Sequence, residues 1–145
     1  MNHFNIHKEI TIYASPETVF DALTQSGQIV RYFPLKEVIS EWRPGEEVLY
    51  KGEVEGVPFT DHGIIQTLVR PHQYSYQYWS DNHGTERLPE NYLTITYTLS
   101  LTDNGTLLKL EQCNIPTESL YKLMDEGVWD YLLNELKQYI EGPSA

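Results

Sequence analysis

Tyrosine is the residue type whose spacing in this sequence most clearly indicates a binding site. The chain has 11 tyrosines in 145 residues, and Tyr74, Tyr76 and Tyr78 occupy alternate positions of one strand-like run. Alternate residues of a strand point to the same face of a sheet. Because the intervening Ser75 and Gln77 are polar, the three tyrosines are predicted to point inward.

Inward-facing tyrosines could form a ligand cavity, because buried hydroxyl groups need hydrogen-bond partners. Tyr97 and Gln112, on two other predicted strands, would face them and add polar groups to an aromatic space, the usual composition of a ligand site. The alternative is an ordinary amphipathic core whose tyrosine hydroxyls reach water at the sheet edge. The residues alone leave both interpretations open.

Few residues could support catalysis or metal binding. Asp81, His83 and Glu86 lie close together in "DNHGTE" and could attract a metal ion, but polar residues also collect in hairpin loops for solubility. His62 beside Asp61 could act as a general base near a cavity rim, or simply be an exposed strand residue. No G-x-S-x-G, phosphate-binding glycine loop or C-x-x-C motif occurs. We therefore predict no catalytic residue, cofactor or metal site.

The composition restricts the partners that are expected. With a formal net charge of −11, the chain lacks the basic surface that nucleic acids and anionic membranes require. It shows neither a signal-peptide pattern nor an apolar run of the roughly 18 residues that a membrane span needs. The single cysteine, Cys113, cannot form an internal disulfide and is expected to be an inert structural thiol. Together these features favour a reduced, cytoplasmic setting.

The elements that must position the tyrosines begin with a strand over residues 6–13 and a short helix. Ser15 is the predicted N-cap of that helix, and Pro16 can take its first position because no donor is needed there. Residues 27–33 predict a second short helix that Pro34 ends.

Alternating apolar and polar residues predict strands through the middle of the chain, over residues 48–54, 59–69 and 74–79. Asn104-Gly105 is a strong hairpin signal between two further strands. The first strand of that hairpin has the clearest alternation, and its predicted buried face comprises Leu93, Ile95, Tyr97, Leu99 and Leu101.

The last segment predicts a long amphipathic helix with Thr117 as N-cap and Gly142-Pro143 as the stop. Gly127 interrupts the helix interior at a cost of roughly 1 kcal/mol relative to Ala, which indicates a bend or a close approach. At helical spacing the apolar stripe comprises Trp129, Leu132, Leu133, Leu136, Tyr139 and Ile140.

These elements predict one α+β domain over residues 1–145, since no repeat or interdomain linker is visible. An antiparallel sheet with one apolar face and a helix with one apolar stripe bury these surfaces against each other, so the helix should cross the sheet. A curved sheet around that helix would leave the two short helices to close one end.

The order of these segments resembles the START-like helix-grip (SRPBCC) superfamily. "SPETVFDAL", "IVRYFP", "RPGEEV" and "GVWDYLLNELKQYIE" are most similar to the branch named for the activator of the heat-shock-90 ATPase. That branch often has Trp where Tyr32 stands, and Gly-Gly where Glu46-Glu47 follow Gly45. The resemblance implies a helix-grip fold, with a cavity between the sheet and the long helix that binds hydrophobic small molecules. It implies no single reaction.

The expected function is therefore binding of a hydrophobic or aromatic small molecule, with a link to stress. One alternative is a co-chaperone-like activator of the heat-shock-90 ATPase, and another is a cyclase- or hydrolase-type enzyme that uses the same cavity. A chaperone contact and a homodimer stay open, whereas nucleic-acid and membrane partners are not expected. The predicted ligand-binding residues are Phe33, Tyr50, Tyr74, Tyr76, Tyr78, Ile95, Tyr97, Leu110, Gln112, Trp129 and Leu133.

Overall fold

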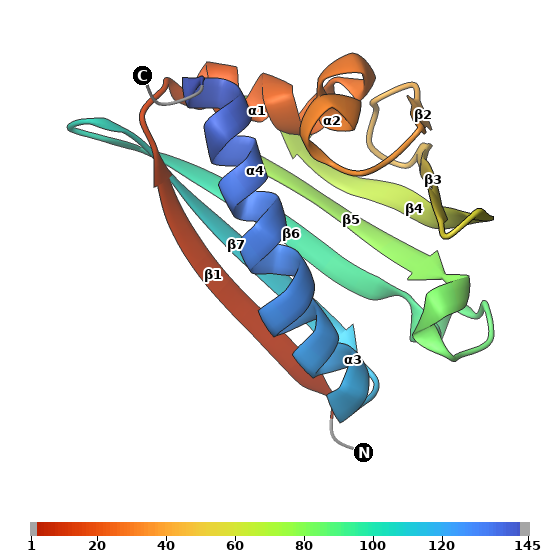
Figure 1. Ribbon diagram of the computed structural model, residues 1–145. Helices are drawn as coiled ribbons and strands as arrows, with labels where there is room; N and C mark the ends of the chain where they lie inside the picture. The colour runs from red at the N-terminus through yellow and green to blue at the C-terminus, as the bar shows by residue number, and fades with distance from the viewer. Residues whose placement is uncertain (1–2, 143–145) are drawn as a thin grey trace.

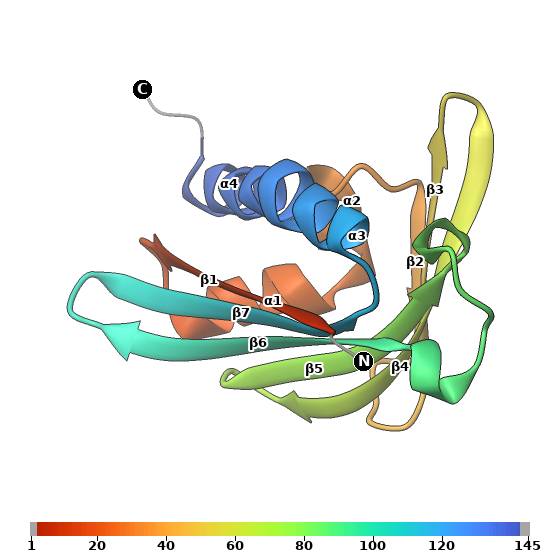
Figure 2. The ribbon, with the colours of Figure 1, turned by 90° about the horizontal axis from the view of Figure 1, so that it is seen from below.

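The computed structural model describes residues 3–142 and contains a seven-stranded antiparallel sheet with helices on one face (Figure 1). The strands are β1 (Phe4–Ile12), β2 (Glu37–Ser40), β3 (Glu47–Val54), β4 (Val57–Val69), β5 (Gln73–Ser80), β6 (Leu93–Thr102) and β7 (Gly105–Ile115). Their order in the sheet is β1-β7-β6-β5-β4-β3-β2, so the first strand pairs with the last. The edge that carries β2 and β3 turns up beside the helices (Figure 2).

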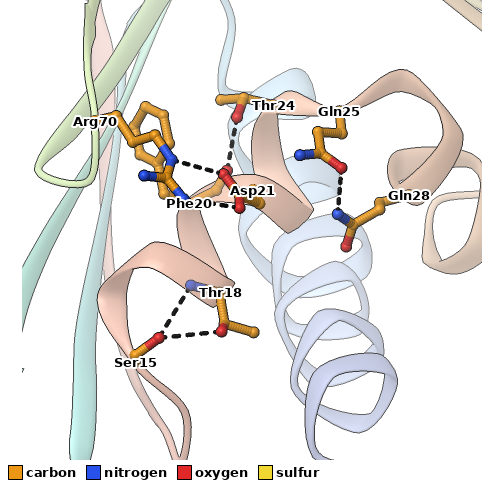
Figure 3. A network of polar contacts seen from close by, with 8 residues as sticks. All are labelled: Ser15, Thr18, Phe20, Asp21, Thr24, Gln25, Gln28 and Arg70. Atoms are coloured by element: carbon orange, nitrogen blue, oxygen red, sulfur yellow. Dashed lines mark hydrogen bonds and ion pairs between the residues drawn. The ribbon is translucent and has the colours of Figure 1, made fainter.

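Two short helices, α1 (Pro16–Thr24) and α2 (Ser26–Tyr32), follow β1 and cover one end of the sheet (Figure 1). The hydroxyl of Ser15 accepts a hydrogen bond from the Thr18 amide at 3.2 Å, which caps α1 as the sequence predicts (Figure 3). On the same helix, Asp21 accepts two hydrogen bonds from the Arg70 guanidinium, at 2.9 and 3.0 Å. This pair ties α1 to the residue that follows β4.

The C-terminal helical region crosses the concave face of the sheet in three segments, namely α3 (Glu118–Lys122), η3 (Leu123–Trp129) and α4 (Asp130–Glu141) (Figures 1 and 2). Its buried side chains pack on the inward faces of the strands and form the core. The predicted α+β helix-grip architecture is thereby confirmed. Within residues 3–142, no helix is long and apolar enough to cross a membrane.

The interruption expected at Gly127 takes the form of a π-helical segment, η3, which contains that glycine. A π-helix bonds residue i to i+5 instead of i+4, so residues five apart come to lie on the same side. Lys8 of β1 contacts this stretch and the helix that follows it, with its Nζ 3.0 Å from Asp125 in η3 and 3.2 Å from Asp130, the first residue of α4.

Two details of the sheet differ from the sequence-based expectation. The strand β2 is not predicted, because its four residues are too few to show an alternation. The prediction that Leu101 is buried is wrong, since this side chain is 76% exposed. The hairpin of β6 and β7 extends past the helices (Figure 1), so a residue near its tip has no helix to pack against.

The space around Gly127 leads to a prediction about stability. A Cβ at this position would meet only Cδ1 of Leu123, at 3.7 Å, so alanine fits and lowers the backbone entropy of the unfolded chain. We expect Gly127→Ala to raise the free energy of unfolding in urea by about 0.5–1 kcal/mol. As a control, Gly105→Ala should destabilise, because Gly105 has a φ of +155° and its Cβ would collide with the backbone oxygen of Ile12. A loss of stability in Gly127→Ala would show that the π-helical turn requires glycine.

Candidate ligand-binding cavity

A cavity of about 430 Å³ lies between the sheet and the C-terminal helical segments. Strands β3 to β6 form one wall, and α3, η3 and the start of α4 form the other. Most of the lining is apolar or aromatic, and three residues (Asp61, Ser80 and His83) give it a polar end. A second, smaller hollow of about 240 Å³ lies at the surface between α2 and α4.

The structure brings six of the predicted binding residues to this cavity and buries the other five outside its lining. The lining includes Phe33, Tyr50, Tyr76, Tyr78, Ile95 and Trp129. The residues buried outside the lining are Tyr74, Tyr97, Leu110, Gln112 and Leu133. The tyrosines of β5 point inward as predicted, and they serve partly as cavity wall and partly as packed core.

Gln112 is fully buried on β7 and orients two of the lining side chains. Its Nε2 donates a hydrogen bond to the Tyr78 hydroxyl at 2.8 Å, and its Oε1 accepts one from the Trp129 indole at 2.7 Å. Buried polar groups need such partners. One amide thus connects strand β5, strand β7 and the end of η3.

Two further tyrosines, Tyr50 and Tyr74, share a hydrogen bond between their hydroxyls. The hydroxyls of Tyr50 and Tyr74 are 2.8 Å apart, and the rings of Tyr74 and Tyr76 stack with centroids 5.0 Å apart. Burial raises the pKa of Tyr50, Tyr74 and Tyr76 well above the ordinary tyrosine value. All three therefore stay neutral near pH 7; the rings of Tyr50 and Tyr76 form an uncharged wall of the cavity, and Tyr74 packs against them from outside the lining.

The π-helical segment supplies the opposite wall. Leu123 and Val128 line the cavity, as do Met124 and Trp129, and the members of each pair are five residues apart. This is the spacing that i-to-i+5 hydrogen bonding places on one side of a helix. In a regular α-helix, residues five apart point in different directions. The interruption at Gly127 therefore widens the apolar surface that faces the cavity.

Asp61 is a cavity residue that the sequence analysis does not select. It pairs with Tyr50 of β3 and Ser80 of β5, and all three line the cavity. Its neighbour His62, considered as a general base, does not line the cavity, and its ring lies 6.2 Å from the ring of Trp79. Asp61 is two residues from Phe59 in the same strand, so both side chains point to the same face, and this spacing is the sequence signal that could have identified Asp61.

His83 lies at the same end of the cavity and is buried, in η1 (Asp81–His83). Its Nδ1 accepts a hydrogen bond from the Ser80 amide at 3.4 Å, and its ring meets the Tyr78 ring edge-on at 5.0 Å. Burial lowers the pKa of His83 to about 4, so the ring is neutral near pH 7. Among residues 3–142, no three His, Cys, Asp or Glu side chains are placed to hold a metal ion.

The pKa of the Asp61 carboxyl group is raised, whereas that of His83 is lowered. Burial is the main cause, and it raises the pKa of Asp61 to about 6. The nearby charge of Asp81 also raises this pKa, whereas a hydrogen bond from the Ser80 side chain lowers it. The polar end of the cavity thus combines an acid that ionises near pH 6 with a neutral imidazole.

A curved sheet, a long C-terminal helix across it and a cavity between them define a protein of the START-like helix-grip class. Residues 13–141 match the family described as Activator of Hsp90 ATPase homolog 1-like protein, and the chain belongs to that family. The predicted resemblance is confirmed. No curated protein matched the chain.

Solved structures show the same fold. Protein ChR145 from Cytophaga hutchinsonii has 30% identity and a TM-score of 0.81, with 95% of this chain and 94% of that chain covered. The Aha1 dimer from Colwellia psychrerythraea has 20% identity and a TM-score of 0.75, covering 95% and 96%. CalU16 from Micromonospora echinospora has 22% identity and a TM-score of 0.68, covering 95% and 75%. At these last two identities the likeness concerns the fold alone.

The raised pKa of Asp61 predicts a pH-dependent gain of stability in Asp61→Asn. In the wild type, the folded state holds this proton up to about pH 6, whereas the unfolded state releases it near pH 4. The wild type therefore loses stability through this group as the pH rises from about 4 to 6. We expect Asp61→Asn to match the wild type near pH 4 and to exceed it by on the order of 2–3 kcal/mol near pH 7.5.

Urea unfolding of both proteins at a series of pH values measures this difference directly. Other titrating groups, including His83, contribute equally to the two proteins and cancel. A difference that stays constant with pH would show that the Asp61 carboxyl ionises as an ordinary exposed acid does.

Proposed function

We propose that this protein binds a hydrophobic or aromatic small molecule in the cavity between the sheet and the C-terminal helix. The supporting observation is a space of about 430 Å³ with a mainly aromatic and aliphatic lining and a few convergent polar groups. Small-molecule sites in proteins have this size and composition. In this proposal the protein acts in the cytoplasm, and capture of an apolar compound would give it a role in stress.

Access to the cavity supports the same proposal. Val54, at the end of β3, and Leu123, at the start of η3, both contribute to the lining and are 58% and 59% exposed. The cavity wall therefore reaches solvent at these two apolar side chains. A bound apolar molecule would cover surface that is otherwise unfavourably hydrated.

The polar end gives no support to a hydrolase. Asp61, Ser80 and His83 are the residue types of a catalytic triad, in which the serine hydroxyl bonds to the histidine and the histidine bonds to the acid. Here the Ser80 side chain bonds to Asp61, and His83 bonds to the Ser80 backbone amide. The imidazole is therefore not placed between the hydroxyl and the carboxylate.

Filling the cavity tests the proposed function. We expect the neutral fluorescent probe N-phenyl-1-naphthylamine to bind the wild type with increased emission. Val128→Trp places a larger side chain in the cavity wall and should weaken probe binding by about tenfold or more. Tyr131→Trp is the matched control, because Tyr131 is on α4 and 51% exposed, and it should bind as the wild type does. Absence of saturable probe binding to the wild type, or equal binding to both variants, would contradict the proposal.

The name of the family raises co-chaperone activity as the alternative. The protein carries a formal net charge of −11, so it would be repelled by acidic partner surfaces and attracted only to basic ones. We expect the isolated protein to have no more than a weak effect on the ATPase rate of a heat-shock-90 chaperone. A several-fold, saturable stimulation that survives Val128→Trp would place the function on the outer surface instead of in the cavity.

A further inference from the structure

The polar end of the cavity contains an acid without a basic partner. Asp61 is the one acidic residue of the cavity lining, and this lining contains no Lys or Arg. None of the ion pairs found among residues 3–142 includes Asp61. Its hydrogen bond comes from the side chain of Ser80, which is uncharged. The charge of the carboxylate is therefore not neutralised by this chain.

The groups around Asp61 add no positive charge. Tyr50 on β3 and Tyr78 on β5 are buried and neutral. In η1, His83 is neutral near pH 7, and the exposed Asp81 carries a further negative charge. The helical wall opposite presents the apolar residues of η3. A negatively charged ligand would thus meet repulsion at this end, whereas a positively charged ligand would meet attraction.

Aromatic rings provide the second feature of the site. Six of them line the cavity, and the faces of aromatic rings attract ammonium groups through their quadrupole, most strongly where water is excluded. The six rings belong to Phe33, Tyr50, Phe59, Tyr76, Tyr78 and Trp129. A carboxylate combined with aromatic walls is the arrangement that suits an organic cation, and the net charge of −11 raises the local concentration of cations.

We propose that the ligand of this cavity is an apolar or aromatic amine, bound as its ammonium ion with the charge against Asp61 and the apolar part along the aromatic rings. This inference rests on the proposed function, and it adds the chemical class of the ligand. A neutral apolar ligand is the competing outcome.

Two compounds of the same shape separate the proposals. Binding of 4-phenylbutylamine and of 4-phenylbutan-1-ol is measured by isothermal titration calorimetry at pH 8. We expect the amine to bind about tenfold more tightly than the alcohol, because both can donate a hydrogen bond to the carboxylate but only the amine brings a positive charge to it and to the aromatic rings. At pH 5 the amine remains charged while Asp61 becomes protonated, so this preference should shrink.

A variant assigns the preference to one carboxylate. Asp61→Asn should reduce amine binding to about the level of the alcohol and weaken alcohol binding much less, and the alcohol binding that remains shows that the cavity is intact. Asp81→Asn is the control, since it removes the same charge from an exposed neighbour outside the lining, and it should retain most of the preference. Equal binding of amine and alcohol to the wild type would overturn this inference and leave the proposed function standing. Binding of neither compound would overturn both.

Discussion

Gln112 on β7 forms hydrogen bonds with side chains from two other elements, Tyr78 on β5 and Trp129 at the end of η3. These groups are buried, and leaving one such donor or acceptor without a partner costs about 1–3 kcal/mol. The amide therefore fixes where the helical region lies on the sheet. Because Trp129 is the last residue of η3, the same contact sets the rotation of the π-helical segment. This rotation in turn determines which side chains of η3 face the cavity.

The cavity persists because its walls are braced from behind. Tyr74 bonds to Tyr50 and stacks on Tyr76, so these rings do not swing into the open space. On the next strands, Gly52 faces Phe59, and a Cβ at this glycine would lie 2.7 Å from the Phe59 ring. Glycine is required there for the ring to lie close over β3. A core of flexible aliphatic side chains could collapse into such a volume, whereas stacked and hydrogen-bonded rings lose contacts by moving.

The sequence predicted the parts of the structure that depend on local chemistry. Ser15 and Pro16 begin α1, the alternation of β5 directs its tyrosines inward, and Gly127 marks the interruption in the last helix. Alternation identifies the face of a strand, but it does not say how far along the strand the helices extend. Leu101 is exposed for that reason. The type of interruption at Gly127 could not be predicted from local spacing, because the segment around it also makes tertiary contacts, from Trp129 to Gln112 and from Asp125 to Lys8.

Asp61 and His83, which the sequence suggested only as a neighbour of a possible general base and as a possible metal ligand, were not predicted to line the cavity for a related reason. Polar residues in strands and short loops usually face water, and only the tertiary arrangement brings Asp61 of β4 and His83 of η1 to the same cavity. The error itself is informative about function, because places where local rules fail are often functional sites.

The burial of Asp61 has an energetic consequence that links stability to binding. A carboxylate whose pKa is raised by burial destabilises the folded state at neutral pH, and an uncharged side chain of the same shape would avoid that cost. Structural acids in proteins usually gain a cationic partner, as Asp21 does with Arg70 and Asp125 does with Lys8. Asp61 has only neutral neighbours on the strands beside it. A cation that entered the cavity would supply the missing partner and recover the lost free energy. Binding of the proposed cationic ligand would thus be coupled to folding stability through one carboxyl group, and the coupling would strengthen as the pH rises through about 6.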